Sequence, residues 1–184
     1  RLMRFTAVHP EIGLRFVPLN FIGEMESIDA DISICWAKEG LIDSPHERLF
    51  ACPACPTGNS YIADKVRKEG LDNVILSTPL LLDSSESTGW QDWFDLAGLD
   101  FSQSQKGLSI ADSNSRVQAV IDGQGIALWD RLVAPEVSSG RLHYLSDIWL
   151  DDYGYYVQAK KSNLESKAVG LFLNWLRDES RDAN

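Results

Sequence analysis

Short apolar runs alternate with capped helical patterns along this chain, and this alternation constrains the fold more than any other feature. The clearest example is an apolar run at 106–111, followed by a helical pattern at 116–122 that Asn114 or Ser115 can cap, and by a second apolar run at 125–129. Short apolar runs are typical of buried strands, and a polar cap marks where a helix begins. Strands that alternate with helices at this spacing predict an α/β fold with largely parallel sheets.

The same signals predict elements elsewhere in the chain. In the helical pattern at 89–96, Trp90 and Trp93 lie three residues apart, a spacing more typical of a core than of a ligand contact. Gly98 then ends this helix. The other expected helices are Leu2–Val8, 61–69 and a last one that Asn163 caps, and the other expected strands are 12–17, 28–36, 48–55, 79–82, 142–145 and Tyr153–Ala159.

Length and charge limit the class of protein. A chain of 184 residues allows one large domain or two small lobes. A formal net charge of −10 repels phosphate backbones and anionic lipid, so we expect no direct contact of this segment with nucleic acid. The sequence also shows no apolar stretch of membrane-spanning length and no secretion signal. We therefore expect a cytoplasmic protein that does not associate with membranes.

The cysteines raise the question of a metal or redox site. Cys52 and Cys55 have the spacing of half a zinc site or of a thiol redox pair. Neither Cys35 nor the histidines offer a second pair of ligands, and an odd cysteine count in a chain of this length argues against a disulfide framework. We expect ordinary, mostly buried thiols, with no metal and no cofactor.

Catalytic motifs are also missing from the sequence. The three histidines, His9, His46 and His143, are scattered, and no Gly-x-Ser-x-Gly motif is present. The glycines at 123–125 follow a helix instead of opening one, so they predict a helix end and a tight turn and not a phosphate cradle. The acidic pair at 151–152 is typical of a solvated turn. We therefore do not expect an enzyme.

Polar and aromatic residues at the ends of predicted strands are the candidate ligand contacts. Ligands of open α/β sheets bind outside the carboxyl ends of the strands, where Trp36 and Trp129 stand. Asn20, Ser113 and Asn114 stand at strand-to-helix turns, where backbone amides can hold a carboxylate. Simple packing by the two tryptophans and helix capping by the polar residues are the open alternatives.

Several segments together resemble a family of bacterial proteins. They are a helix that ends at His9-Pro10 before an extended run at 11–16, the acidic strand opening at 29–34, Trp90 and Trp93 followed by Gly98, the stretch 117–128, and the shorter pieces 140–142 and 155–157. Nearly the whole chain is thus similar to the effector-binding domain of LysR-type transcriptional regulators, particularly the subgroup that includes the glycine-cleavage activator. The winged helix-turn-helix of that family and the first strand of its effector domain have no counterpart in these residues.

The resemblance implies two Rossmann-like lobes of the periplasmic-binding-protein type II class. Lobe I would comprise 1–56 and 159–184, and lobe II would comprise 57–158. A small effector, an amino acid or other small carboxylate, would lie between the lobes and shift the arrangement of regulator subunits. The effector contacts expected from this arrangement and from the strand ends are Asn20, Trp36, Ser113, Asn114, Trp129, Tyr153 and Tyr155.

The same resemblance implies a homodimer, or a tetramer for the full-length protein, that binds DNA only through its N-terminal part. The expected dimer contacts are Leu2 and Phe5 on the first helix and Arg116 and Val120 on the helix at 116–122. Two other interpretations stay open. One is a solute-binding protein of a transport system, and the other is a small α/β enzyme.

Overall fold

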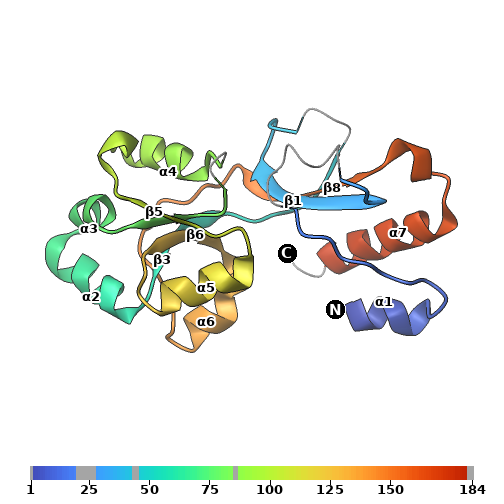
Figure 1. Cartoon of the computed structure of the whole chain (residues 1–184), viewed down its shortest axis with the longest axis horizontal. Helices are drawn as coiled ribbons and strands as arrows, with labels where there is room; N and C mark the ends of the chain where they lie inside the picture. The colour runs from blue at the N-terminus through green and yellow to red at the C-terminus, as the bar shows by residue number, and fades with distance from the viewer. Residues whose placement is uncertain (1, 20–27, 43–45, 85–86, 182–184) are drawn as a thin grey trace. The chain divides into compact units, whose positions relative to one another are not determined.

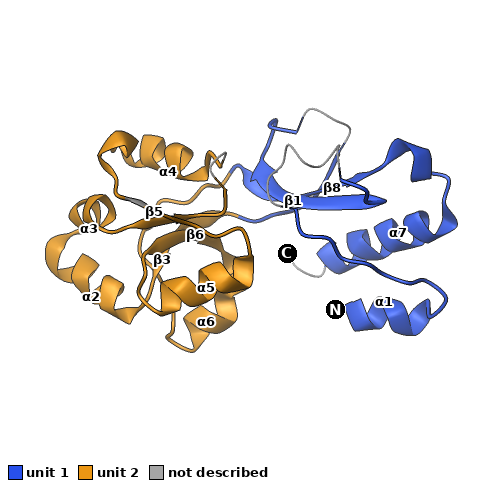
Figure 2. Ribbon diagram, viewed as in Figure 1, with its two compact units in different colours: residues 1–52, 152–184 blue, residues 53–151 orange. Residues whose placement is uncertain are grey.

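Two compact units make up the chain, and Figure 2 colours them separately. The computed structural model describes residues 2–19, 28–42, 46–84 and 87–181. Unit 1 comprises residues 1–52 and 152–184, and unit 2 comprises residues 53–151. Each unit contains both helices and strands, so the α/β class expected from the sequence is confirmed.

The boundaries of the units lie elsewhere than the expected lobe boundaries after residues 56 and 158. Strand β8 (Tyr153–Ala159) is the central strand of the sheet in unit 1, so all of it belongs to that unit. The single strand expected at 48–55 is wrong. Two strands replace it, β2 (Glu47–Ala51) in unit 1 and β3 (Ala54–Gly58) in unit 2, and the chain passes from one unit to the other between them.

Unit 1 contains an antiparallel sheet in the order β1-β8-β2, where β1 spans Ile32–Lys38. The central strand comes from the far end of the chain and pairs with β1 along its whole length, from Ile32 opposite Ala159 to Lys38 opposite Tyr153. Because a strand late in the sequence lies between two early ones, both parts of the chain are needed to form this sheet.

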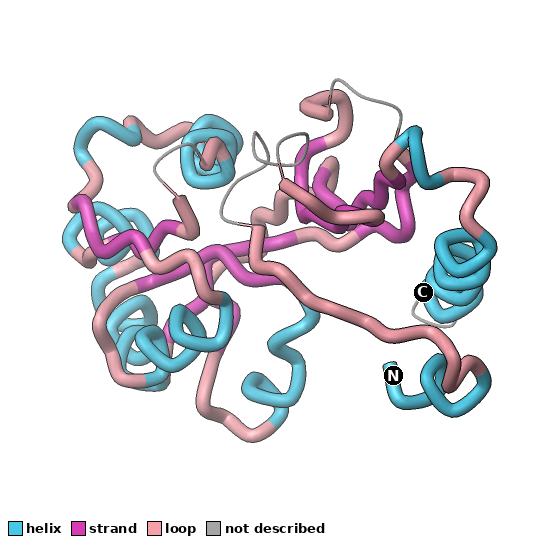
Figure 3. Tube along the Cα trace, turned by 45° about the vertical axis from the view of Figure 1, so that its right-hand side comes forward, coloured by secondary structure: helices cyan, strands magenta, loops and turns pink. Residues whose placement is uncertain are grey.

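Two helices, α1 (Leu2–Val8) and α7 (Lys167–Arg181), contact each other in unit 1 (Figure 3). Phe5 of α1 is 1% exposed, and its ring packs edge-on against Phe172 of α7 at 5.0 Å between centroids. The first helix is thus confirmed. The last helix begins at Lys167 and is not capped by Asn163, whose side-chain amide instead donates a hydrogen bond to Asp31.

The strand expected at 12–17 is wrong. These residues form no strand, and within the described part of the chain no strand pairs with them. Their alternating apolar pattern is present, but Phe16 is 67% exposed and Val17 is 44% exposed. A strand needs a neighbour for its backbone hydrogen bonds, so pattern alone does not produce one here.

Ion pairing joins α7 to the first residue of β2. The Arg177 guanidinium donates Nε and Nη2 to the Glu47 carboxylate, with the shortest distance 2.7 Å from Nη2 to Oε2. This hydrogen bonding lowers the pKa of Glu47 from its ordinary value and raises that of Arg177. The carboxylate form of Glu47 therefore stabilises the folded state at neutral pH, and this contribution is lost as pH falls through the lowered pKa.

Replacing Glu47 by glutamine is accordingly expected to lower the free energy of unfolding by less than about 1 kcal/mol at pH 7, because the pair is partly exposed. The difference between the variant and the parent should shrink from pH 7 to about pH 3, because the Glu47 carboxyl becomes increasingly protonated as pH falls through its lowered pKa. Urea titrations at the two pH values measure this difference. Glu165→Gln, an exposed site without an ion-pair partner among the described residues, is the control. If Glu47→Gln lowered the free energy of unfolding more at pH 3 than at pH 7, the predicted pH dependence would be wrong.

Unit 2 is built on a mixed sheet with the strand order β5-β4-β6-β3-β7. Its strands are β3, β4 (Leu80–Leu82), β5 (Lys106–Ser109), β6 (Ile126–Asp130) and β7 (His143–Tyr144). Strand β4 pairs in parallel with β5 and β6, whereas β3 is antiparallel to β6 and β7. The largely parallel sheet expected from the sequence is therefore correct only for β4, β5 and β6.

Helices cover both faces of this sheet, with α4 (Gly89–Ala97) on one side and α5 (Ser113–Ile121) on the other (Figure 1). The expected helix at 61–69 is α2 (Ser60–Glu69), which Asn59 caps by accepting a hydrogen bond from the backbone N–H of Ile62 at 3.0 Å. Two further helices were not expected. Helix α3 (Leu71–Ser77) follows α2 with no strand between them, and α6 (Ala134–Ser138) follows β6 after a single 3-10 turn.

The aromatic side chains of α4 form part of the core of unit 2. Trp93 and Phe94 are each 0% exposed and Trp90 is 2% exposed. The Trp93 indole N–H donates to the carbonyl of Ile148 at 3.0 Å, and the Trp90 indole N–H donates to the carbonyl of Leu81 at 3.1 Å. The expectation that Trp93 belongs to the core is thus confirmed.

Candidate functional site

The parallel strands of unit 2 place their carboxyl ends at one edge of the sheet, which we call the carboxyl edge. Residues 112–115 follow β5 there, and Trp129 and Asp130 end β6. Ala54, at the start of β3, pairs with Asp130 and bridges to Leu150, so both connections to unit 1 also leave from this edge. Ligands of open α/β sheets bind at such an edge.

Helix α5 begins at the carboxyl edge with a side-chain cap. The cap is Asp112, so the expectation that Asn114 or Ser115 caps this helix is wrong. Asp112 accepts a hydrogen bond from the backbone N–H of Ser115 at 2.8 Å, and its hydrogen bonds with Ser115 lower its pKa. Ser113 and Asn114, both predicted ligand contacts, are exposed in the first turn. The first amides of a helix have no carbonyl partner within it, so this turn can hold an acceptor such as a carboxylate oxygen.

A buried arginine lies next to this turn. Arg116 is only 8% exposed, although it was expected at a dimer contact. Its Nη1 donates to the carbonyls of Ile110 and Ala111, and its guanidinium carbon lies 4.8 Å from the centroid of the Trp129 ring. Arg116 therefore fixes the turn between β5 and α5 and the indole beside it, because one group holds both.

Trp129 carries the most informative polar atom of the carboxyl edge. The residue is 9% exposed, and its indole Nε1 is buried without a hydrogen-bond partner in the described residues. Leaving a buried donor unsatisfied costs about 1–3 kcal/mol, so this N–H is suited to an acceptor from a ligand or from water. Trp129 also packs with Leu81, Val120 and Leu142 in a core cluster, so both readings of this residue, packing and ligand contact, have support.

The candidate effector contacts in unit 1 mostly pack against other residues of the same unit. The half-buried Trp36 ring stacks on Tyr153 with 4.3 Å between centroids, and its indole N–H donates to the carbonyl of Cys52 at 2.8 Å. Tyr153 is 2% exposed, and Tyr155 packs against Phe50. Trp36 and Tyr153 thus form a rigid aromatic pair beside the residue where the chain leaves unit 1. Asn20 lies outside the described residues.

The expected dimer contacts are largely buried inside their own units. Phe5 is 1% exposed and Val120 is 0% exposed, so neither offers apolar area to a second chain. Arg116 is also buried, so its charge is not available for an ion pair with a second chain. Leu2 is 39% exposed. The exposed apolar side chains on α1 that the prediction did not name are Met3 and Val8, at 85% and 71%.

The cysteines form no site in the described residues. Cys52 and Cys55 are each 0% exposed and belong to different units, and Cys35 is 7% exposed. No group of three or more His, Cys, Asp or Glu side chains among the described residues is arranged to hold a metal ion. Burial raises the pKa of the Cys35 thiol to about 11 and that of the Cys55 thiol to about 12, so both stay protonated at neutral pH.

We expect all three thiols to react only slowly with an alkylating reagent at pH 8, and rapidly once the chain is unfolded in guanidinium. Burial keeps the reagent away from all three, and it also keeps Cys35 and Cys55 protonated. Mass spectrometry after a short exposure counts the modified thiols. Since burial raises the pKa of Cys35 and Cys55, stability should also decline as pH rises above the ordinary thiol pKa of about 8.5. Rapid modification of any one cysteine in the native chain would contradict its burial.

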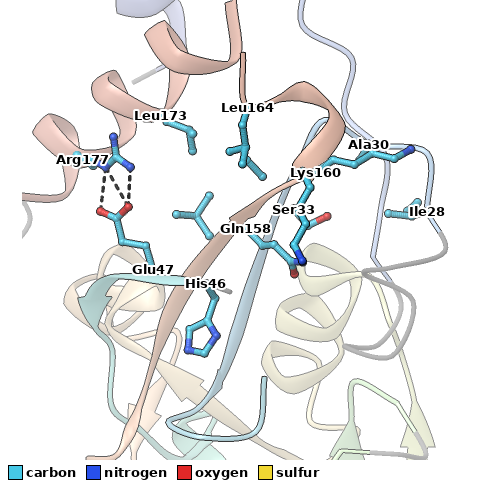
Figure 4. A pocket seen from close by; sticks show the side chains of 13 residues that line it. Ile28, Ala30, Ser33, His46, Glu47, Gln158, Lys160, Leu164, Leu173 and Arg177 are labelled. Carbon is cyan, nitrogen blue, oxygen red and sulfur yellow. Dashed lines mark hydrogen bonds and ion pairs between the residues drawn. The ribbon is translucent and has the colours of Figure 1, made fainter. Parts of the chain in front are cut away.

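A pocket of about 780 Å³ lies in unit 1, at the end of β8 beside α7 (Figure 4). Its lining comes from segments far apart in the sequence, including Ser33 of β1, Glu47 of β2, Gln158 of β8 and Leu173 of α7. No sequence motif marks it, because the residues approach one another only when β8 pairs between β1 and β2. It was accordingly missed at the level of sequence.

Comparison with known proteins gives a consistent result. The model of the LysR substrate binding domain family matches residues 1–181. The glycine cleavage system transcriptional activator of Escherichia coli K12 is 25% identical over 180 residues, which cover 96% of this chain and 58% of that protein. The chain therefore spans little more than half the length of this curated relative.

Solved structures show the same fold. The effector domain of the transcriptional regulator AmpR of Pseudomonas aeruginosa superposes with a TM-score of 0.77 at 23% identity, covering 100% of this chain and 88% of that one. Full-length LysG of Corynebacterium glutamicum, solved with the effector Arg bound, superposes with a TM-score of 0.61 at 19% identity, covering 86% of this chain and 54% of that one. No helix among the described residues is long and apolar enough to span a membrane.

Proposed function

Because this chain belongs to the LysR substrate-binding domain family, we propose that it is the effector-sensing part of a bacterial LysR-type transcriptional regulator. The observation that carries this proposal is the family match over residues 1–181, together with the division of the chain into two α/β units. The family is one of transcriptional regulators and not of enzymes, and we propose that this chain performs no catalysis. Such a regulator would act in the cytoplasm and bind DNA through a separate N-terminal part.

We propose that the effector is an amino acid or another small carboxylate that binds at the carboxyl edge of unit 2. The exposed Ser113 and Asn114 stand at the start of α5, where free amides favour an anion. The buried Trp129 Nε1 supplies a donor that has no acceptor among the described residues. LysG, a relative of the same fold, has been solved with the effector Arg.

Transcriptional output requires that the effector favour one arrangement of subunits. A ligand shifts such an equilibrium only through different affinities for the two states. We propose a homodimer in which the exposed face of α1, formed by Leu2, Met3 and Val8, contacts a second chain. The full-length protein would then form a dimer or tetramer.

Trp129→Phe tests the effector site, because it keeps an aromatic ring but removes the indole N–H. The screen uses amino acids and small carboxylates, with thermal shift for detection and calorimetry for affinity. We expect the variant to bind the best compound about tenfold more weakly, the loss of one good hydrogen bond. Its unfolding temperature should fall by a few degrees, because phenylalanine fills less of the space that Trp129 occupies in the core cluster. Trp175→Phe in unit 1 is the matched control and should keep full affinity. Unchanged affinity in Trp129→Phe would overturn this site, and the absence of any binding compound would count against the proposed effector class.

A further inference from the structure

The pocket in unit 1 arises from a mismatch in strand length. Strand β2 begins opposite Val157, so Gln158 and Ala159 of β8 pair with β1 on one side and, among the described residues, with no strand on the other. Helix α7 passes beside this end, where Leu173 lines the pocket, and Leu164 lines it from the turn before that helix (Figure 4). The pocket therefore has an aliphatic wall that no part of the described sheet fills.

Charge at the pocket differs in sign from the charge of the whole chain. Three cationic side chains, Lys160, Lys161 and Arg177, line it against the single carboxylate of Glu47, although the chain carries a formal charge of −10. Arg177 is held by Glu47, and Lys160 lies 3.6 Å from the carboxylate of Asp29. Lys161 is left without an ion-pair or hydrogen-bond partner among the described residues. One cation is thus free to pair with a ligand.

The polar groups around the aliphatic wall limit the class of ligand further. Ser33 lies opposite Gln158 across β1 and β8, and its hydroxyl can donate a hydrogen bond beside the wall. The His46 ring packs edge-on against Tyr156, so it is engaged within the unit. One unpaired lysine is better suited to a singly charged anionic group of a ligand than to a phosphate dianion. The aliphatic side chains are suited to a saturated hydrocarbon chain in the same ligand.

We propose that this pocket binds an aliphatic monocarboxylate, with the carboxylate at Lys161 and the chain against Leu164 and Leu173. The site lies wholly in unit 1 and shares no residue with the carboxyl edge of unit 2. It therefore gives the regulator a second small-molecule input that goes beyond the proposed effector site.

Hexanoate is the probe, titrated into the ¹⁵N-labelled 184-residue chain and followed by backbone amide chemical shifts. We expect saturable shifts at Ser33, Lys161 and Leu164 with millimolar affinity, the range for a ligand of this size. Hexanol and acetate should bind much more weakly, because each lacks one half of the ligand. Lys161→Gln should weaken binding about fivefold to tenfold, whereas Lys68→Gln, an equal change of charge on exposed α2, should not. Leu164→Ser should also weaken it.

Three results would overturn the proposal. They are no saturable shifts, equal binding of hexanol and hexanoate, and equal effects of the two lysine substitutions. Trp129→Phe separates the two sites, since it should leave hexanoate affinity unchanged. A loss of hexanoate binding in that variant would place the probe at the carboxyl edge and reject the pocket. Failure to find any amino-acid effector, with hexanoate binding intact, would instead reject only the proposed effector class.

Discussion

Trp93→Ala is expected to lower the free energy of unfolding of unit 2 by about 4 kcal/mol, the range for removing a large aromatic side chain from a packed core. The indole is 0% exposed and lies 6.1 Å from the Trp90 ring and 5.6 Å from the Phe94 ring, between centroids. Its loss also leaves the Ile148 carbonyl without its donor. Since a domain of this kind has a total stability of about 5–15 kcal/mol, much of unit 2 should be unfolded well below the parent transition.

Leu96→Ala on the same helix provides the control for Trp93→Ala. Leu96 is 59% exposed, so its truncation leaves no cavity and should change the unfolding free energy by less than about 0.5 kcal/mol. Urea titration followed by circular dichroism gives the global value, and amide hydrogen exchange resolves unit 2 from unit 1. Similar losses in the two variants would show that Trp93 is not central to the core.

Helix ends could be predicted from the sequence because their signals are local. Asn59 caps α2 through its own side chain, and Gly98 ends α4 with a φ of 69°, which glycine adopts without strain. The failed prediction at the last helix shows the limit of such signals. Asn163 can cap a helix, but its side chain bonds Asp31, a residue more than a hundred positions earlier.

Strand pairing could be predicted less well because it depends on distant partners. The pattern at 12–17 has the right alternation, yet no described strand pairs with it. The run at 48–55 reads as one strand, although Pro53 lies where the chain changes sheets. The direction of β3, antiparallel to β6, is likewise set by where the chain enters unit 2 and not by its composition.

For the candidate ligand contacts too, local features could be predicted from the sequence and features that depend on distant residues could not. The sequence correctly places Trp129 and the turn at 112–115 at strand ends, because the strands themselves are recognisable. It does not reveal that the Trp129 N–H is unsatisfied or that Arg116 is buried beside it, since both depend on packing between α5 and β6. The pocket in unit 1 depends on three separate segments and leaves no local signal.

Arg116→Met is expected to lower the unfolding free energy of unit 2 by about 2 kcal/mol. Methionine keeps much of the apolar stem, but the carbonyls of Ile110 and Ala111 lose a charged donor and the Trp129 ring loses its cation. An acceptor left unsatisfied away from water costs about 1–3 kcal/mol, and the exposed Ala111 carbonyl costs less because water reaches it. A cation over an aromatic ring contributes about 0.5–2 kcal/mol. The variant does not bury a guanidinium and so avoids its desolvation cost, which offsets part of this loss. The net loss of unfolding free energy therefore stays near the lower end of the sum.

The effect of Arg116→Met should be concentrated at the start of α5, because Arg116 holds the turn that precedes it. Amide exchange of Ser115, whose N–H bonds the Asp112 carboxylate, should accelerate more than exchange in the strands of the sheet. Arg67→Met, which removes an exposed ion pair to Asp64, is the matched control and should cost less than about 0.5 kcal/mol. Arg116→Lys should recover only part of the loss, since a single ammonium cannot both donate to the two carbonyls and place a planar cation over the Trp129 ring. If Arg116→Met were as stable as the parent, the arginine would not be holding this turn, and the rigid first turn of α5 that the effector proposal needs would have to come from Asp112 alone.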